Sequence, residues 1–135
     1  MNYWLNPRAL LALACLLLGS NMVVAHPLAP SLLQLDAEGD GRYAISWKTP
    51  IKKAAGSRLQ PLLPAHCSPL EGAESSRAAT AIVFNWRIDC GATDLVGSSV
   101  GVSGIASSKA DVLLRITLAD GRSLHHVLNA SEEQF

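Results

Sequence analysis

Apolar and polar side chains alternate along much of the chain beyond residue 40. A period of two residues places successive side chains on opposite faces of an extended strand, so the alternation predicts strands with one buried face. It is clearest over 43–48, 82–88 and 112–118. The same alternation directs Trp47 and Trp86 toward the interior.

The third of these segments continues into another apolar stretch. Ala119-Asp120-Gly121 makes a tight connection from residue 118 to the segment 122–128. An Asp-Gly pair between two such stretches is typical of a hairpin turn. The chain is therefore predicted to form a β-hairpin here.

Weaker strand patterns occupy 31–36, 59–63 and 96–105, the last interrupted by glycines that suggest bulges or close backbone approach. Prolines in the first half and glycines in the second leave no amphipathic helix pattern. About seven short strands separated by turn signals predict an all-β fold, an antiparallel β-sandwich. The polar segment 68–79, rich in small residues, is expected to be a mobile loop.

The first 25 residues have a different pattern. Arg8 is their only charged residue, and 9–19 is an uninterrupted apolar run. These features are typical of the first two regions of a signal peptide, and the small or modest Val23 and Ala25 suit its cleavage site. We predict a cleavable signal helix at 1–25, cut after Ala25, followed by a single extracytoplasmic β domain at 26–135. The protein is then periplasmic or secreted.

Charge and hydropathy restrict the partners of that domain. The chain has 11 Lys plus Arg and 11 Asp plus Glu, a balance that gives no support for a nucleic-acid partner. No run of 18 apolar residues follows Ala25. A bilayer core of about 30 Å needs a longer apolar helix than any that remains, so no membrane span is expected after signal removal.

Cleavage after Ala25 removes Cys15 and leaves two cysteines, Cys67 and Cys90. Disulfides persist in extracytoplasmic compartments, so these two are predicted to pair. The alternative interpretation, a metal site or a reactive thiol, needs further soft ligands nearby, and only His66 is adjacent in sequence.

Motifs for catalysis are absent from the sequence. It has no glycine-rich phosphate loop, HExxH, CxxC or GxSxG motif. Asp36, Asp89, Asp94 and Asp111 fall at predicted strand ends or turns, where aspartate commonly caps the backbone. The sequence therefore predicts a protein that is not an enzyme and has no catalytic residues or resident cofactor.

Histidines provide an alternative hypothesis of copper or nickel binding. If cleavage follows Ala25, the amine and imidazole of His26 could chelate a metal together with His125 or His126, because nitrogen ligands suit Cu(II). This arrangement resembles the histidine brace of CopC-type copper proteins and of copper-dependent polysaccharide oxygenases. Alternation places His126 on the face of Leu128 and His125 on the opposite face, which predicts one partly buried and one exposed ring.

Short motifs spread over 26–133 carry a family resemblance. They are Ala25-His26-Pro27-Leu28-Ala29-Pro30, Leu32-Leu33-Gln34-Leu35, Gly41-Arg42-Tyr43, Trp47-Lys48-Thr49-Pro50, Leu62-Leu63-Pro64 with Cys67, and Asp89-Cys90-Gly91. The set resembles the exported amino-terminal domain of HupE/UreJ-like membrane proteins, which are associated with hydrogenase and urease operons and with nickel supply.

The resemblance implies a partner and a class of function. In that family the β domain precedes a multi-helix membrane portion, whereas this sequence stops at Phe135 before any such helix. A stand-alone domain, a truncated or split gene and a precursor fragment remain open interpretations. The leading hypothesis is a non-enzymatic interaction module beside an inner-membrane HupE/UreJ-like protein. The alternative is the small metal-binding protein that uses His26.

Overall fold

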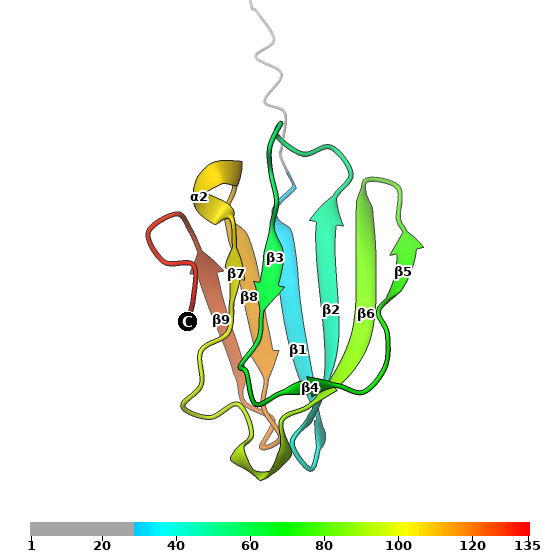
Figure 1. Ribbon diagram of the computed structural model, residues 1–135, viewed down its shortest axis with the longest axis vertical. Helices are drawn as coiled ribbons and strands as arrows, with labels where there is room; N and C mark the ends of the chain where they lie inside the picture. The colour runs from blue at the N-terminus through cyan, green and yellow to red at the C-terminus, as the bar shows by residue number, and fades with distance from the viewer. Residues whose placement is uncertain (1–28) are drawn as a thin grey trace, which may run out of the picture.

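Strands make up nearly all the regular structure of the protein, for which a computed structural model describes residues 29–135 (Figure 1). The predicted signal helix, its cleavage site at Ala25 and the candidate ligand His26 lie outside the described residues. In chain order the elements are β1 (Ser31–Gly39), β2 (Arg42–Pro50), β3 (Gln60–Leu62), β4 (Ser68–Pro69), β5 (Glu74–Arg77), β6 (Ala81–Asp89), the 3-10 helix η1 (Gly91–Thr93), β7 (Gly101–Ser103), the single-turn helix α2 (Ile105–Ser108), β8 (Val112–Thr117) and β9 (Ser123–Leu128). The predicted all-β character is confirmed.

Seven strands form one large sheet in the order β4-β6-β2-β1-β8-β9, with β5 also paired to β6. Within it, β1 and β8 are parallel, from Ser31 opposite Val112 to Asp36 opposite Thr117. The prediction of a purely antiparallel arrangement is wrong at this pair. Alternation shows which face a side chain occupies, but it carries no information about the direction of the neighbouring strand. A parallel neighbour requires a long crossover, and here residues 40–111 separate the two strands in the chain.

That second layer is a small sheet of β3 and β7, which lies over the β1 and β8 side of the large sheet (Figure 1). The carboxyl-terminal residues extend it, because the Val102 amide donates to the Glu133 carbonyl and Val100 exchanges two hydrogen bonds with Phe135. Gly101 permits this contact, since a Cβ there would lie 2.2 Å from the Glu133 carbonyl oxygen. The predicted close backbone approach is thus confirmed at this glycine.

The hydrophobic core lies between the two layers. Leu33 and Leu35 of β1 are fully buried, and the predicted inward rows of β2 and β8 are buried beside them. The opposite face of the large sheet is polar or exposed, as Leu113 shows with 39 % exposure. On β6, however, Phe84 and Trp86 of the predicted inward row are only partly buried.

The segment 68–79, predicted as a mobile loop, instead forms β4 and β5 along β6. Because β2 occupies one edge of β6 over its whole length, both short strands pair with the other edge. Their side chains are exposed on both faces, so the segment has no apolar alternation to reveal it. The predicted strand 96–105 is likewise reduced to β7, and α2 follows it.

The predicted disulfide between Cys67 and Cys90 is confirmed. It joins the residue before β4 to the residue after β6, and Cys90 is almost fully buried. The Cys90 amide also donates to the Gly41 carbonyl in the turn between β1 and β2. Three turns are therefore tied together at this end of the large sheet. Within 29–135, no helix has the length and apolar character that crossing a bilayer requires.

Candidate functional site

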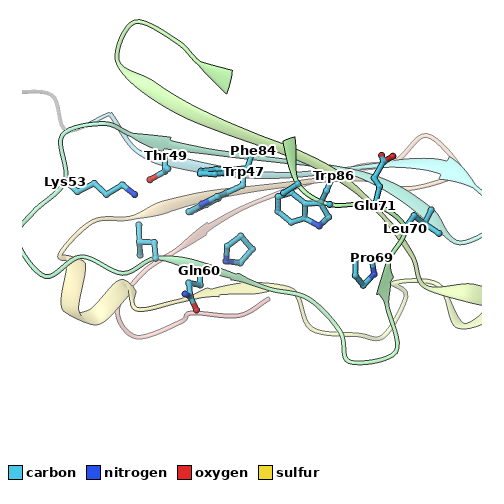
Figure 2. A pocket seen from close by; sticks show the side chains of 13 residues that line it. Trp47, Thr49, Lys53, Gln60, Pro69, Leu70, Glu71, Phe84 and Trp86 are labelled. Carbon is cyan, nitrogen blue, oxygen red and sulfur yellow. The ribbon is translucent and has the colours of Figure 1, made fainter. Parts of the chain in front are cut away.

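An aromatic groove lies where the inward face of the large sheet extends past the second layer. Its floor is Trp47 of β2 with Phe84 and Trp86 of β6 (Figure 2). Trp47 and Phe84 face each other directly in the β2–β6 register, so both project from the same face. The second layer covers β1 and β8 but leaves this side open, which explains why the β6 aromatics are only partly buried (Figure 1).

Apolar side chains from two segments form the walls of the groove. Leu59 and Pro61 stand on the side of the second layer, and Pro69 and Leu70 stand on the side of β4. The volume of this open groove is about 690 Å³. Pockets that bind small molecules typically measure about 300–1,000 Å³ and combine an apolar lining with a few polar groups. The groove has the dimensions and lining of a ligand site.

The polar lining groups are separated along the groove. Thr49 and Lys53 lie at one end, and Glu71 lies toward the other (Figure 2). Thr49 is 1 % exposed, and its hydroxyl has no hydrogen-bond partner within 29–135. Lys53 is exposed and takes part in none of the ion pairs found among the same residues. One end of the groove therefore carries a cation close to a buried hydroxyl, and the other carries a carboxylate.

A second polar cluster joins Tyr43, Asp94 and His66 near the disulfide. The buried Tyr43 hydroxyl donates to the Asp94 carboxylate, which also accepts the Leu95 amide at 2.7 Å. His66 Nε2 lies 2.9 Å from the Asp94 carbonyl oxygen. Asp94 has a φ of 56°, a conformation that these contacts maintain. The cluster attaches the loop after η1 to β2 and is structural in character.

Tyr43 supplies a pH-dependent prediction. Burial, with the hydrogen bond to Asp94, raises the pKa of the Tyr43 hydroxyl well above its ordinary value of 10.0. In the folded state Tyr43 keeps its proton to a higher pH than in the unfolded chain. The stability that this difference in pKa contributes is complete below pH 10.0, and it is lost as Tyr43 of the unfolded chain ionises above that pH. We expect the free energy of unfolding to fall above that pH. Tyrosinate absorbance, read as wild type minus Tyr43→Phe, should appear only with unfolding, and its appearance in the folded protein would contradict this assignment.

The two alternative metal ligands of β9 lie on different faces of the strand. His125 is exposed and His126 partly buried, as the alternation predicted. Adjacent residues of a strand project to opposite faces, so the two rings cannot bind one ion together. The His126 ring stacks on Phe135 with centroids 4.4 Å apart, and its Nε2 lies 3.2 Å from a Glu132 carboxylate oxygen. The metal site that includes His26 stays a prediction.

One group of three potential ligands gathers within 29–135, namely His66, Cys67 and Cys90, whose ligand atoms lie within 4.8 Å of one another. Both sulfur atoms form the disulfide. A cysteine binds a metal ion through its thiolate, and neither Cys67 nor Cys90 has a free thiolate while the disulfide is intact. This group therefore does not form a metal site in the oxidised protein. Of the candidate carboxylates, Asp89 accepts the Gly91 amide at 2.8 Å, the turn-capping role predicted for it.

The aromatic groove was not predicted from the sequence. Alternation correctly placed Trp47 and Trp86 on inward rows. It could not show that the second layer leaves β6 uncovered. The available signal was the concentration of three large aromatics on the inward rows of two strands, beside a proline-rich segment without apolar alternation.

Comparison of the sequence with models of known protein families and with curated proteins found no match. The resemblances to HupE/UreJ-like and CopC-type proteins therefore stay predictions.

Proposed function

We propose that this protein is a non-enzymatic extracytoplasmic binding module that holds an apolar ligand in the aromatic groove. The observation that carries the proposal is the row formed by Trp47, Phe84 and Trp86, which the second layer leaves open. Aromatic side chains contribute large contact areas to binding sites because they are rigid and apolar. A domain that binds no ligand would be more stable if its second layer covered this aromatic row completely.

The composition of the groove supports binding without catalysis. Its lining contains no histidine, cysteine or aspartate. Lys53 and Glu71, its two charged groups, lie toward opposite ends and are not arranged as an acid–base pair (Figure 2). General acid–base or nucleophilic catalysis requires such groups within hydrogen-bond reach of one another or of the same substrate atom.

The setting of the proposal follows from the disulfide and the predicted signal peptide. A disulfide that closes a small domain persists in oxidising compartments, which supports a periplasmic or secreted location. We interpret the two layers as a β-sandwich whose larger half is the mixed sheet. The predicted inner-membrane HupE/UreJ-like partner would place this module beside a membrane, where apolar ligands are concentrated.

Replacing Trp86 by alanine tests the groove directly. Nile red, an uncharged dye that fluoresces in apolar sites, is titrated into protein purified from cells that express the full chain. We expect saturable binding, and we expect Trp86→Ala to weaken it at least about tenfold, or about 1.4 kcal/mol, since a large aromatic contact is lost. The control is Val127→Ala, an exposed apolar residue of β9 outside the groove. Equal loss in both variants, or no binding by wild type, would overturn the proposal.

A further inference from the structure

We infer that the occupant of the aromatic groove is a fatty acid, a single unbranched chain with one carboxylate, whose head group lies at Thr49 and Lys53. The inference rests on the proposed function and assigns its ligand class. The apolar chain would then extend over Trp47, Phe84 and Trp86. Four observations support it: the charge along the groove, a hydrogen-bond donor, the backbone pairing of β3 and the polarity of the lining.

Charge is polarised along the groove. The loop between β2 and β3 carries Lys52, Lys53 and Arg58 and no acidic residue. The segment after β4 carries Glu71 at the groove and Glu74 just beyond it. An anionic head is attracted to the first end and repelled by the second, so the ligand would bind in one orientation.

The Thr49 hydroxyl gives that end a specific donor. It is buried in the wall of the groove at the same end as Lys53, and it lacks a hydrogen-bond partner within 29–135. A buried hydroxyl without a partner is unfavourable, so such groups in native proteins commonly have a function. A carboxylate would accept this donor, and hydrogen bonds to a charged acceptor are stronger than neutral ones.

The backbone beside the groove disfavours a peptide strand as the occupant. Within the second layer, the Val102 amide donates toward the carboxyl-terminal segment, so Pro61, its β3 partner, has its backbone directed to the open edge. Proline has no amide hydrogen to donate at that edge. A strand added there would lack a hydrogen bond at the centre of the three-residue β3.

A sugar fits the lining less well than an acyl chain. Besides the charged Lys53 and Glu71, the hydrogen-bonding side chains of the groove are Thr49, Gln60 and the indole N–H donors of Trp47 and Trp86. A carbohydrate carries a hydroxyl on most of its carbons and would lose water contacts that these few groups cannot replace. The apolar floor and walls match methylene groups, which need no partner.

The test compares decanoate with 1-decanol, which share a chain length but differ in head-group charge. Tryptophan emission reports on the groove, because Trp4→Phe leaves Trp47 and Trp86 as the only tryptophans of the full chain. At pH 7.5 we expect decanoate to bind at least about fivefold more tightly than decanol, since the charge-assisted contacts are made by the carboxylate alone.

Two variants identify the head-group site. Lys53→Gln should remove the preference for decanoate, whereas Lys48→Gln should retain it, because Lys48 is exposed on the opposite face of β2. Thr49→Val should weaken decanoate binding more than decanol binding, because a hydrogen bond to a charged acceptor is stronger than one to an alcohol oxygen. Without ligand, the same variant should raise the urea midpoint, because it replaces a buried hydroxyl that has no partner. A role confined to stability would not alter the preference between the two ligands.

The outcomes separate this inference from the proposed function. Equal affinity for decanoate and decanol, or a preference unchanged by Lys53→Gln, would overturn the fatty-acid assignment while leaving an apolar site in place. If neither compound nor Nile red binds, both proposals fail together. A wild-type preference that Lys53→Gln removes and Lys48→Gln retains would support the assignment.

Discussion

Replacing Leu35 by alanine is expected to lower the free energy of unfolding by about 3 kcal/mol, within the range measured for fully buried leucines. Leu35 has 0 % exposure and lies in β1, opposite Ile45 of β2 and Ile116 of β8. The substitution removes apolar contacts at the centre of the large sheet, where neighbours on both sides are held by strand pairing. Urea unfolding followed by circular dichroism gives the difference from the shift in midpoint.

Leu113→Ala is the matched control for this prediction. Leu113 lies on β8 with 39 % exposure, on the face of the sheet away from the second layer. The same chemical change should there cost no more than about 0.5 kcal/mol, as is usual for surface positions. A comparable loss in the two variants would show that the assignment of the buried face is wrong.

Loss of the disulfide between Cys67 and Cys90 is expected to lower the free energy of unfolding by about 3 kcal/mol in the chain-entropy account. The two cysteines are 23 positions apart, so the bond removes a substantial part of the freedom of the unfolded loop. Cys67→Ala with Cys90→Ala is the suitable variant, because Cys90 is buried and a serine there would introduce an additional polar group. Its urea midpoint is compared with that of the oxidised wild type.

The reduced wild type serves as the control for the alanine substitutions. It should unfold close to the double variant, and a midpoint that reduction leaves unchanged would contradict the prediction. Pro69 and Leu70, which form one wall of the groove, follow Cys67 closely in the chain. Both forms that lack the bond should therefore also bind Nile red more weakly than the oxidised protein.

The long strands were predictable because each has one buried and one exposed face. Alternation located β2, β6 and β8, and the Asp-Gly turn located β9 as the second strand of the last hairpin. The pairing of Cys67 with Cys90 followed from the count of cysteines after the predicted cleavage site. These features depend on local pattern or on composition, which a single sequence displays directly.

Other features depended on tertiary packing. The edge strands β4 and β5 have no buried face, and the parallel β1–β8 pair is determined by the path of the crossover. The candidate site was missed for a related reason. Whether Phe84 and Trp86 are covered depends on where β3 lies, and β3 is three residues long and contains Pro61. Histidines and carboxylates are recognisable in the sequence as candidate ligands, whereas the exposure of this aromatic row arises only in the folded protein.

The parallel pairing of β1 with β8 has a consequence for folding kinetics. β2 follows β1 across a short turn, whereas β8 begins about 80 residues after the start of β1. Closing the longer loop costs more chain entropy. The hairpin of β1 and β2 can form early, but the other edge of β1 must wait for the end of the chain. During that interval β1 has an open edge, which is able to pair with another molecule. Aggregation during refolding should therefore rise steeply with protein concentration, even though in the native sheet β1 is paired along both edges.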